Sequence, residues 1–435
     1  MSLRLRLLWL AALAAPAVLT LVLIAVYGEN VPQWDEYTMV TLFAQHDQGT
    51  LDAGSFWHLH NEHRPVLPRL ILFGLAFLTD WDLRVELYVD FAVAVATFAL
   101  LVVALRRTLP RQWFVAASVV TAVLFFSPMQ WENWLWGWQL TWFLSNLAAV
   151  GVLWALTVTV DRAPRAGLAL AIACGLVASL SLGSGLLLWP IGLALLLLRG
   201  RPWRIWAVAG VATIAVYLIG YERPAHHPST TEFVKRPIDF AEYVLVYLGR
   251  AFGFDTATGG LAGVALVAVF AVAAGLALRR RGDGALLDRA AIWLGLGVYC
   301  LGAALMTGLS RLGFGPVQAG ASRYTTTALL FGIATVALVF VLVTQPRPAG
   351  RALTPLLRFR LSYLVAGPLL LLGLVNTVDG ADRFARHGRN LDRAAACVRQ
   401  ATSPRDPCLR HPSSGYEPEQ SRGIAYSRRV GWGGF

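Results

Sequence analysis

The sequence predicts an all-α, polytopic membrane protein with about eleven transmembrane helices, each close to the roughly 20 residues that cross a hydrocarbon core. Two observations besides the apolar runs predict this fold class. The 435-residue chain is 57% hydrophobic, and its mean hydropathy is +0.57. Only 14% of its residues are charged, whereas soluble domains carry about 25%.

The expected crossings follow the apolar runs in chain order. They are 7–27, 84–105, 112–127, 139–160, 166–182, 185–198, 204–220, 260–278, 290–309, 323–344 and 361–377. The first run follows Arg4 and Arg6 and so resembles a signal peptide, but it is longer than a typical signal sequence. We therefore expect a retained first helix.

The arginines predict the orientation of these helices. The N-terminus and every short connection on one side carry at least two arginines; these connections are 106–111, 161–165, 199–204, 279–289 and 347–360. Such a bias is typical of cytoplasmic loops. It places the N-terminus in the cytoplasm and the C-terminus outside. The net charge of +12 therefore reports topology and does not indicate nucleic-acid binding.

The opposite, extracytoplasmic side holds 28–83, 128–138, 221–259, 310–322 and the end of the chain. Segment 65–79 is apolar but short and contains two prolines, so we expect a helix at the membrane interface, and 240–254 is a second such candidate. Residues 1–377 form the transmembrane domain. The polar tail 378–435 has too few apolar residues for a core, and we expect a loosely ordered extension.

The four cysteines fall into two groups. Cys174 and Cys300 lie inside apolar spans, where we expect inert thiols. Cys397 and Cys408 lie in the polar tail and could form a disulfide if the tail faces an oxidising compartment.

Polar residues are concentrated just after the first apolar run. Residues 33–37 read Gln-Trp-Asp-Glu-Tyr, so Asp35 and Glu36 are adjacent acids between two aromatic residues. Charged groups are costly to desolvate, and membrane proteins usually retain them for chemistry or ligand charge. Adjacent side chains point in different directions in a strand or a helix. We expect one of these acids, Asp35 or Glu36, to be catalytic, and we do not expect the two to act as a matched acid/base pair. The alternative is a solvated turn that only ends the helix.

A second polar cluster, His-Leu-His-Asn-Glu-His-Arg, covers residues 58–64. On a helix, His60, His63 and Arg64 would share a face, and Glu62 lies between the two histidines in the chain. His60 and His63, together with Asp35, are candidate ligands for a divalent metal ion, and hydrogen-bonded structural histidines are the alternative. Arg64 would bind phosphate or cap the interfacial helix.

The remaining outer segments add candidate substrate-binding residues, namely Glu132, Asn133, Arg311, Arg323 and Tyr324. The tryptophans 131, 134, 136, 138 and 142 predict an aromatic belt, with a sugar-stacking surface as the alternative. Residues 181–185 (Ser-Leu-Gly-Ser-Gly) predict a tight outer turn between helices, with a phosphate-binding loop as the alternative. His226 and His227 are expected to be surface residues.

This inventory suits transfer of a sugar from a lipid phosphate to a hydroxyl at the membrane surface. A phosphate leaves as an anion and needs no general acid, so one carboxylate that takes the acceptor's proton suffices, whereas glycoside hydrolysis requires two. Forked guanidinium groups bind phosphate well. Asp35 would be the base, and Arg64, Arg311 or Arg323 would hold the phosphate. The sequence contains no Walker-type loop or dinucleotide fingerprint.

Three motifs carry a resemblance to a known family. Trp34-Asp35-Glu36, His60-Asn61-Glu62-His63-Arg64 and Trp131-Glu132-Asn133-Trp134 resemble a family of bacterial multi-span proteins related to the GT-C superfamily of membrane glycosyltransferases. The resemblance is best over residues 1–145. It differs from many members in having His-Asn-Glu-His-Arg-Pro in place of His-Pro-Pro, and in lacking a large soluble C-terminal domain.

The resemblance implies a GT-C-like bundle in the bacterial inner membrane with its active site in the first periplasmic loop, 28–83. It implies an inverting transferase that takes a sugar from a polyprenyl-phosphate donor to a lipid or glycan acceptor, with Asp35 as base and Glu36 second. No cofactor is implied by the resemblance, and a divalent metal stays open only as the alternative raised by His60 and His63. Two rival functions are a transporter or flippase, which would place ionisable groups near the bilayer midplane, and a non-catalytic subunit of envelope-polysaccharide assembly.

Overall fold

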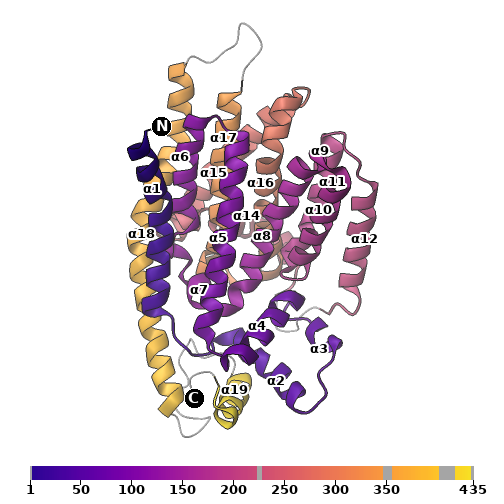
Figure 1. Cartoon of the computed structure of the whole chain (residues 1–435), viewed down its shortest axis with the longest axis vertical. Coiled ribbons are helices and arrows are strands. Elements are labelled where there is room, and N and C mark those ends of the chain that lie inside the picture. The colour runs from indigo at the N-terminus through magenta and orange to yellow at the C-terminus, as the bar shows by residue number, and fades with distance from the viewer. Residues whose placement is uncertain (1, 223–227, 346–354, 401–416, 433–435) are drawn as a thin grey trace.

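The computed structural model describes residues 2–222, 228–345, 355–400 and 417–432. Within these ranges the regular structure is helical, and the single β-type pairing is an isolated bridge between His60 and His63. Long helices run along the longest axis, with the N-terminus at the upper end and the C-terminus at the lower end (Figure 1). The expected all-α bundle is confirmed for this part of the chain.

The longest helices form the body of the bundle. They are α1 (Leu3–Tyr27), α5 (Leu83–Thr108), α6 (Arg111–Phe125), α8 (Leu140–Trp154), α10 (Pro164–Ser179), α11 (Leu188–Leu198), α12 (Arg204–Leu218), α14 (Pro237–Gly249), α15 (Thr256–Arg279), α16 (Gly284–Arg311), α17 (Thr325–Thr344) and α18 (Pro355–Gln400). Shorter helices are α2 (Met39–Asp47), α3 (Ala53–Trp57), α4 (Val66–Thr79), α7 (Trp131–Leu135), α9 (Val160–Arg162), α13 (Glu232–Lys235) and α19 (Glu417–Val430).

Single helical turns connect these elements. The 3₁₀ turns are η1 (Trp34–Thr38), η2 (Pro128–Gln130), η3 (Gly137–Gln139), η5 (Gly183–Leu187), η6 (Arg250–Phe252), η7 (Leu312–Phe314), η8 (Pro316–Gly320) and η9 (Ser322–Tyr324). The segment η4 (Ala155–Thr159) is a π-helical turn that continues α8.

Eight helical stretches of the described chain are long and apolar enough to cross a membrane, which makes this a multi-pass membrane architecture. Three of the expected crossings, 166–182, 185–198 and 204–220, correspond to α10, α11 and α12. These helices are 16, 11 and 15 residues long, below the roughly 20 residues of a typical span. The count of eleven crossings therefore stays a prediction.

Helix α17 forms the centre of the bundle. Almost all of its side chains are buried, and it packs against α6, α14, α15, α16 and α18. A helix that is apolar on every side is typical of a protein core or a membrane span, and here the neighbouring helices, not the outside of the bundle, cover it. Because η9 leads directly into α17, this central helix fixes Arg323 and Tyr324 at the lower end of the bundle.

Helices α14 and α15 approach each other closely through glycines. A Cβ on Gly249 would lie 2.0 Å from the carbonyl oxygen of Gly259, and one on Gly263 would lie 2.0 Å from that of Leu245. Small residues permit such close backbone packing between membrane helices. The segment 240–254, expected at the membrane interface, forms α14 and η6 and buries Tyr243 and Tyr247 against the neighbouring helices.

The first outer loop folds into a layer of short helices at the lower end of the bundle (Figure 1). It contains α2, α3 and α4, and α4 confirms the expected helix at 65–79. A second apolar core lies in this layer, where Phe43 contacts the rings of Phe73, Phe77 and Trp81. This core gives the loop a fixed shape, so its polar residues occupy defined positions.

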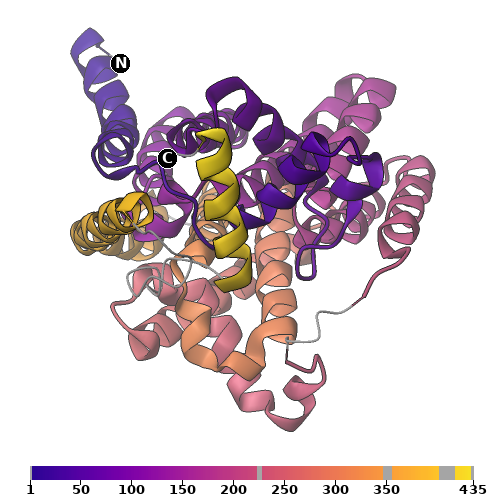
Figure 2. The ribbon, with the colours of Figure 1, turned by 90° about the horizontal axis from the view of Figure 1, so that it is seen from below.

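The expectation of a loosely ordered tail is wrong for the described residues. Helix α18 continues without interruption to Gln400, and α19 lies across the lower face (Figure 2). Tyr426 of α19 stacks on Phe43, and a Cβ on Gly423 would lie 2.3 Å from the Tyr37 ring. The end of the chain therefore packs directly on η1, the turn that carries Asp35.

The structure describes three of the four cysteines. Cys174 and Cys300 are free thiols, and Cys300 is fully buried. Cys397, at the lower end of α18, is disulfide-bonded. Cys408, which the sequence suggests as its partner, lies outside the described residues.

Candidate functional site

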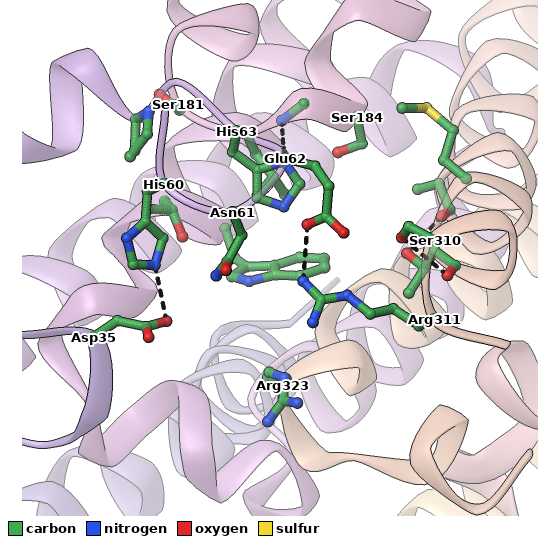
Figure 3. A pocket seen from close by; sticks show the side chains of 18 of the residues that line it. Asp35, His60, Asn61, Glu62, His63, Ser181, Ser184, Ser310, Arg311 and Arg323 are labelled. Carbon is green, nitrogen blue, oxygen red and sulfur yellow. Dashed lines mark hydrogen bonds and ion pairs between the residues drawn. The ribbon is translucent and has the colours of Figure 1, made fainter. Parts of the chain in front are cut away.

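A cavity of about 1010 Å³ lies at the lower end of the bundle. Its wall is built from η1, the turn at 60–63, η3, η5 and the lower ends of α12 and α16, and Figure 3 shows the polar residues that face it. Seven of the predicted site residues line it: Asp35, His60, Glu62, His63, Arg311, Arg323 and Tyr324. Four do not: Glu36, Arg64, Glu132 and Asn133.

Asp35 occupies a tight turn directly after the first helix. The preceding residue, Trp34, has a φ of 37°, in the left-handed region that non-glycine residues rarely adopt. The Trp34 ring packs edge-on against Trp136 at 4.8 Å, which holds the turn in place. Oδ2 of Asp35 lies 3.2 Å from Nε2 of His60. The sequence thus places its leading candidate base in a constrained turn with a histidine partner.

The surroundings of Asp35 favour its ionised form. Desolvation acts to raise its pKa, but the charge and hydrogen bond of His60 and the charges of Arg323 and Arg311 outweigh it and hold the pKa below its usual range. Asp35 is therefore a carboxylate at neutral pH. It can accept a proton, and the adjacent imidazole can share it.

Residues 60–63 form a tight turn, so the helix considered for this segment is wrong. The backbone N of His60 donates to the carbonyl of His63 (2.8 Å), and the N of His63 donates to that of His60 (3.0 Å). Asn61 has a φ of 51°, which asparagine tolerates in turns. The turn sends the two histidines in different directions. His60 faces Asp35, and Nδ1 of His63 accepts from the backbone N of Gly183 in η5 (3.3 Å).

Glu62 and Arg311 form an ion pair across the cavity. Nη2 of Arg311, at the last turn of α16, donates to Oε2 of Glu62 at 2.9 Å. Both side chains are largely buried, being 13% and 20% exposed for Glu62 and Arg311. The pair joins two segments that are 249 residues apart in the chain.

Arg323 projects into the same cavity from η9, and two predicted substrate ligands support it from behind. Oε2 of Glu132 accepts from the backbone N of Arg323 (2.7 Å), and its Oε1 lies 3.5 Å from the guanidinium. Nδ2 of Asn133 donates to the Arg323 carbonyl (3.1 Å) and to Oγ1 of Thr326 (2.6 Å). Glu132 and Asn133 therefore hold η9 in position and do not face the cavity.

Arg64 does not line the cavity, so the structure gives no support to its expected role as a phosphate ligand. Its side chain is buried, and its guanidinium donates to the carbonyls of Tyr217 (2.9 Å), Trp57 (2.7 Å) and Ile219 (2.6 Å). Carbonyls at the end of a helix lack intrahelical partners. Arg64 satisfies those at the end of α12 and so ties this helix to the first outer loop.

Replacement of Arg64 by methionine is expected to destabilise the fold. Three carbonyls, one buried and two partly buried, would lose a charged donor, at about 2–4 kcal/mol in all. The apparent melting temperature of the purified protein measures this loss. Arg84→Met is the matched control, because Arg84 is exposed and pairs with Asp82, two residues away in the chain. An unchanged melting temperature with impaired binding of a lipid phosphate would instead restore the phosphate role of Arg64.

Glu36 lies behind the cavity wall and is only 2% exposed. Burial raises its pKa to about 8, against the lowering effect of the backbone N–H groups of Gln33, Trp138 and Gly137, and the charge of Asp35 raises it further. Its expected role as a second catalytic acid is not compatible with this position. Of the two adjacent acids, Asp35 alone faces the cavity.

The tryptophan cluster does not form a lipid-facing belt. Trp136, Trp138 and Trp142 line the cavity together with Trp34. Trp134 is fully buried, and Trp131 packs on the ring of His387 at 4.4 Å. Indole rings beside carboxylates and guanidinium groups present flat apolar faces to a ligand. The alternative of a sugar-stacking surface therefore fits better than the belt.

Several lining residues were not among the predicted site residues. Hydroxyl groups come from Ser181 and Ser184 of the predicted tight turn, and from Ser310 and Thr307 of α16. The Ser-Leu-Gly-Ser-Gly run was the available signal for the first two. The residues of α16 gave none, because isolated hydroxyls are common in membrane helices.

One edge of the cavity is apolar. Leu218 at the end of α12 and Phe314 in η7 both line it, and they are about half exposed, at 52% and 49%. Met306 and Leu309 continue the apolar lining along α16. The cavity thus has a charged end and an apolar edge that reaches the outside of the bundle. Helix α12 stands at the periphery in Figure 2.

The candidate metal ligands do not form a metal site. Among the described residues, no group of three or more His, Cys, Asp or Glu side chains is arranged to hold a metal ion. Asp35 pairs with His60, whereas His63 turns toward η5. His226 and His227 lie outside the described residues.

Comparison with known proteins adds no assignment to this geometry. No protein-family model, no curated protein and no solved structure matches the chain, so its function has to be inferred from the residues of the cavity.

Proposed function

We propose that this chain is a membrane glycosyltransferase that moves a sugar from a polyprenyl-phosphate donor to an acceptor hydroxyl. The observation that carries the proposal is the convergence of Asp35 and His60 with Arg311 and Arg323 on one cavity with an apolar, outward-reaching edge. A lipid-linked sugar phosphate has the same three parts in the same order: a polar sugar, an anionic phosphate and an apolar chain.

The chemistry requires one base and a cationic phosphate site. The acceptor oxygen attacks the anomeric carbon as the bond from that carbon to the phosphate oxygen breaks, and the hydroxyl proton passes to Asp35. The products are the glycosylated acceptor and a polyprenyl phosphate that carries one more negative charge than the donor's phosphodiester. Arg311 and Arg323 would stabilise that added charge. A single displacement inverts the anomeric centre.

Two observations support an extracytoplasmic cavity at a bacterial inner membrane. The arginine-rich connections 106–111, 161–165, 199–204 and 279–289 lie at the upper end with the N-terminus (Figure 1), as expected of cytoplasmic loops. Cys397, at the end that holds the cavity, is disulfide-bonded, and disulfides persist in oxidising compartments.

A proton-coupled transporter or flippase is the second candidate, and one observation favours it. Glu86 and Asp90 are buried in α5, at 2% and 1% exposed, so this span carries two buried acids. Buried acids in membrane helices are a feature of proton relays. However, both lie within the first eight residues of α5, and neither lines the cavity. A midplane substrate site, which transporters require, is not formed by the cavity residues.

Product analysis after gene deletion tests the proposal. A transferase deletion is expected to remove one glycan and to accumulate a polyprenyl-phosphate sugar, and complementation with the wild-type gene should reverse both. Proteoliposomes that hold purified protein and a polyprenyl-phosphate hexose should then release polyprenyl phosphate when acceptor is present. Movement of the intact donor across the vesicle membrane without release would instead favour the flippase.

A further inference from the structure

The buried acid Glu36 joins two parts of the cavity wall that are far apart in sequence. Its Oε2 accepts from the backbone N of Gln33 (2.6 Å), and its Oε1 accepts from the backbone N of Trp138 (3.3 Å). The first contact closes η1, which carries Asp35. The second reaches η3, 102 residues further along the chain.

These contacts complete a closed ring of four residues. The Trp138 indole packs against the His60 imidazole with 4.8 Å between ring centroids. His60 lies 3.2 Å from Asp35, Asp35 precedes Glu36 in the chain, and Glu36 accepts from Trp138. Three members face the cavity, and Glu36 lies behind them. A shift of the Glu36 side chain would therefore be transmitted to the carboxylate and the indole together.

A second acid fixes the other side of η3. A Cβ built on Gly137 would lie 2.3 Å from Oε2 and 2.6 Å from Cβ of Glu86. Because Gly137 has no side chain, Glu86 can occupy the space beside it. Turn η3 is therefore held between α5 and η1. The junction is completed by Nε2 of Gln33, which donates to the Leu135 carbonyl (2.6 Å).

We propose that Glu36 is a positioning residue that fixes Asp35 and Trp138 against each other across the cavity. The inference rests on the proposed transferase function for its catalytic consequence, but the contact itself can be tested without activity. Carboxylates next to Glu36 are Asp35 in its own turn and Glu86 and Asp90 in α5, and the Tyr37 phenol adjoins it. Burial and the charge of Asp35 both raise the pKa of Glu36, so a neutral Glu36 suits this environment.

Hydrogen exchange and kinetics of three full-length variants test the proposal. Glu36→Leu removes both acceptors at similar volume, Glu36→Gln keeps one acceptor oxygen on a neutral group, and Glu242→Leu changes an exposed acid in α14 as a control. In Glu36→Leu, amides in peptides that cover 33–38 and 136–140 should exchange about 10- to 100-fold faster. The change should stay under about threefold in the glutamine variant and the control.

Kinetics separate a positioning role from a chemical one. Glu36→Leu should lower kcat by about 100-fold, because small displacements of a reacting group carry such costs, with KM within about threefold of wild type. Glu36→Gln should recover most of kcat. Unchanged amide exchange in Glu36→Leu would overturn the proposal. So would a glutamine variant that exchanges normally and yet is as inactive as Asp35→Asn, since Glu36 would then act in the chemistry.

Gly137→Ala provides an independent perturbation of the same contact. The added methyl group meets Glu86, so faster exchange over 136–140 is expected while Glu36 is intact. If Asp35→Asn retains wild-type transfer, the proposed function fails, but the exchange data still decide whether Glu36 fixes the two turns.

Discussion

Replacement of Asp35 by asparagine is expected to lower the rate of sugar transfer by about 10²- to 10⁴-fold, the usual contribution of a positioned general base. Asparagine has the same shape and keeps a hydrogen-bonding partner for His60, which lies 3.2 Å away. The variant should therefore fold, insert and bind donor normally. Release of polyprenyl phosphate in proteoliposomes measures the rate, and tryptophan fluorescence reports donor binding because four indoles line the cavity.

Asp80→Asn is the matched control for this substitution. Asp80 is an exposed acid in the same outer loop and has a φ of 52°, a conformation that asparagine tolerates well. Its replacement should leave transfer within about twofold of wild type, as for most exposed sites away from special features. Wild-type transfer by Asp35→Asn would remove Asp35 from the mechanism.

The pH dependence of the transfer rate tests the direction in which the pKa of Asp35 is shifted. Its pKa lies below the ordinary value of 3.8, so Asp35 contributes stability that is present above that value and is lost as pH falls through its lower folded pKa. No acid limb from Asp35 should appear in the rate above about pH 4. A limb that persists in Asp35→Asn belongs to another group.

The position of the site was easier to predict from the sequence than the role of each residue in it. Charges are expensive in an apolar chain, so the cluster around Asp35 and His60 was visible as a functional segment. Which of two adjacent acids faces a cavity depends on the direction of one turn, and that direction is set by packing of Trp34 on Trp136, 102 residues away. Composition contains no information about such a contact.

The arginines illustrate the same limit. Arg64 and Arg311 are equally plausible phosphate ligands in the sequence, because both lie in predicted outer segments. The structure distinguishes them because α12 ends beside Arg64. The guanidinium of Arg64 therefore donates to the carbonyls of Tyr217 and Ile219 and not into the cavity. The prediction of a loosely ordered tail at 378–435 was wrong for a different reason. A polar helix such as α19 needs only a few apolar side chains, with Tyr426 among them, to dock on an existing core.

The ion pair of Glu62 and Arg311 allows the phosphate role to be separated from a structural one. Arg311→Gln alone leaves Glu62 as a largely buried carboxylate without this cation. Breaking such a pair costs about 3–5 kcal/mol when it is fully buried, and the residual exposure of 13% and 20% reduces the expected loss to about 1–3 kcal/mol. This single variant would be both less stable and less active, so it cannot distinguish the two roles.

The double variant Glu62→Gln with Arg311→Gln makes the distinction. Two amides can hydrogen-bond across the 2.9 Å contact without net charge, so the melting temperature should return close to that of the wild type. Transfer should remain about 10²- to 10³-fold below wild type, because one donor to the leaving phosphate is missing. Glu62→Gln alone should keep most activity, since Arg311 remains. Recovery of transfer in the double variant would show that Arg311 serves only to neutralise Glu62, and Arg323 would then be the single cation of the cavity wall, among the described residues, available to the phosphate.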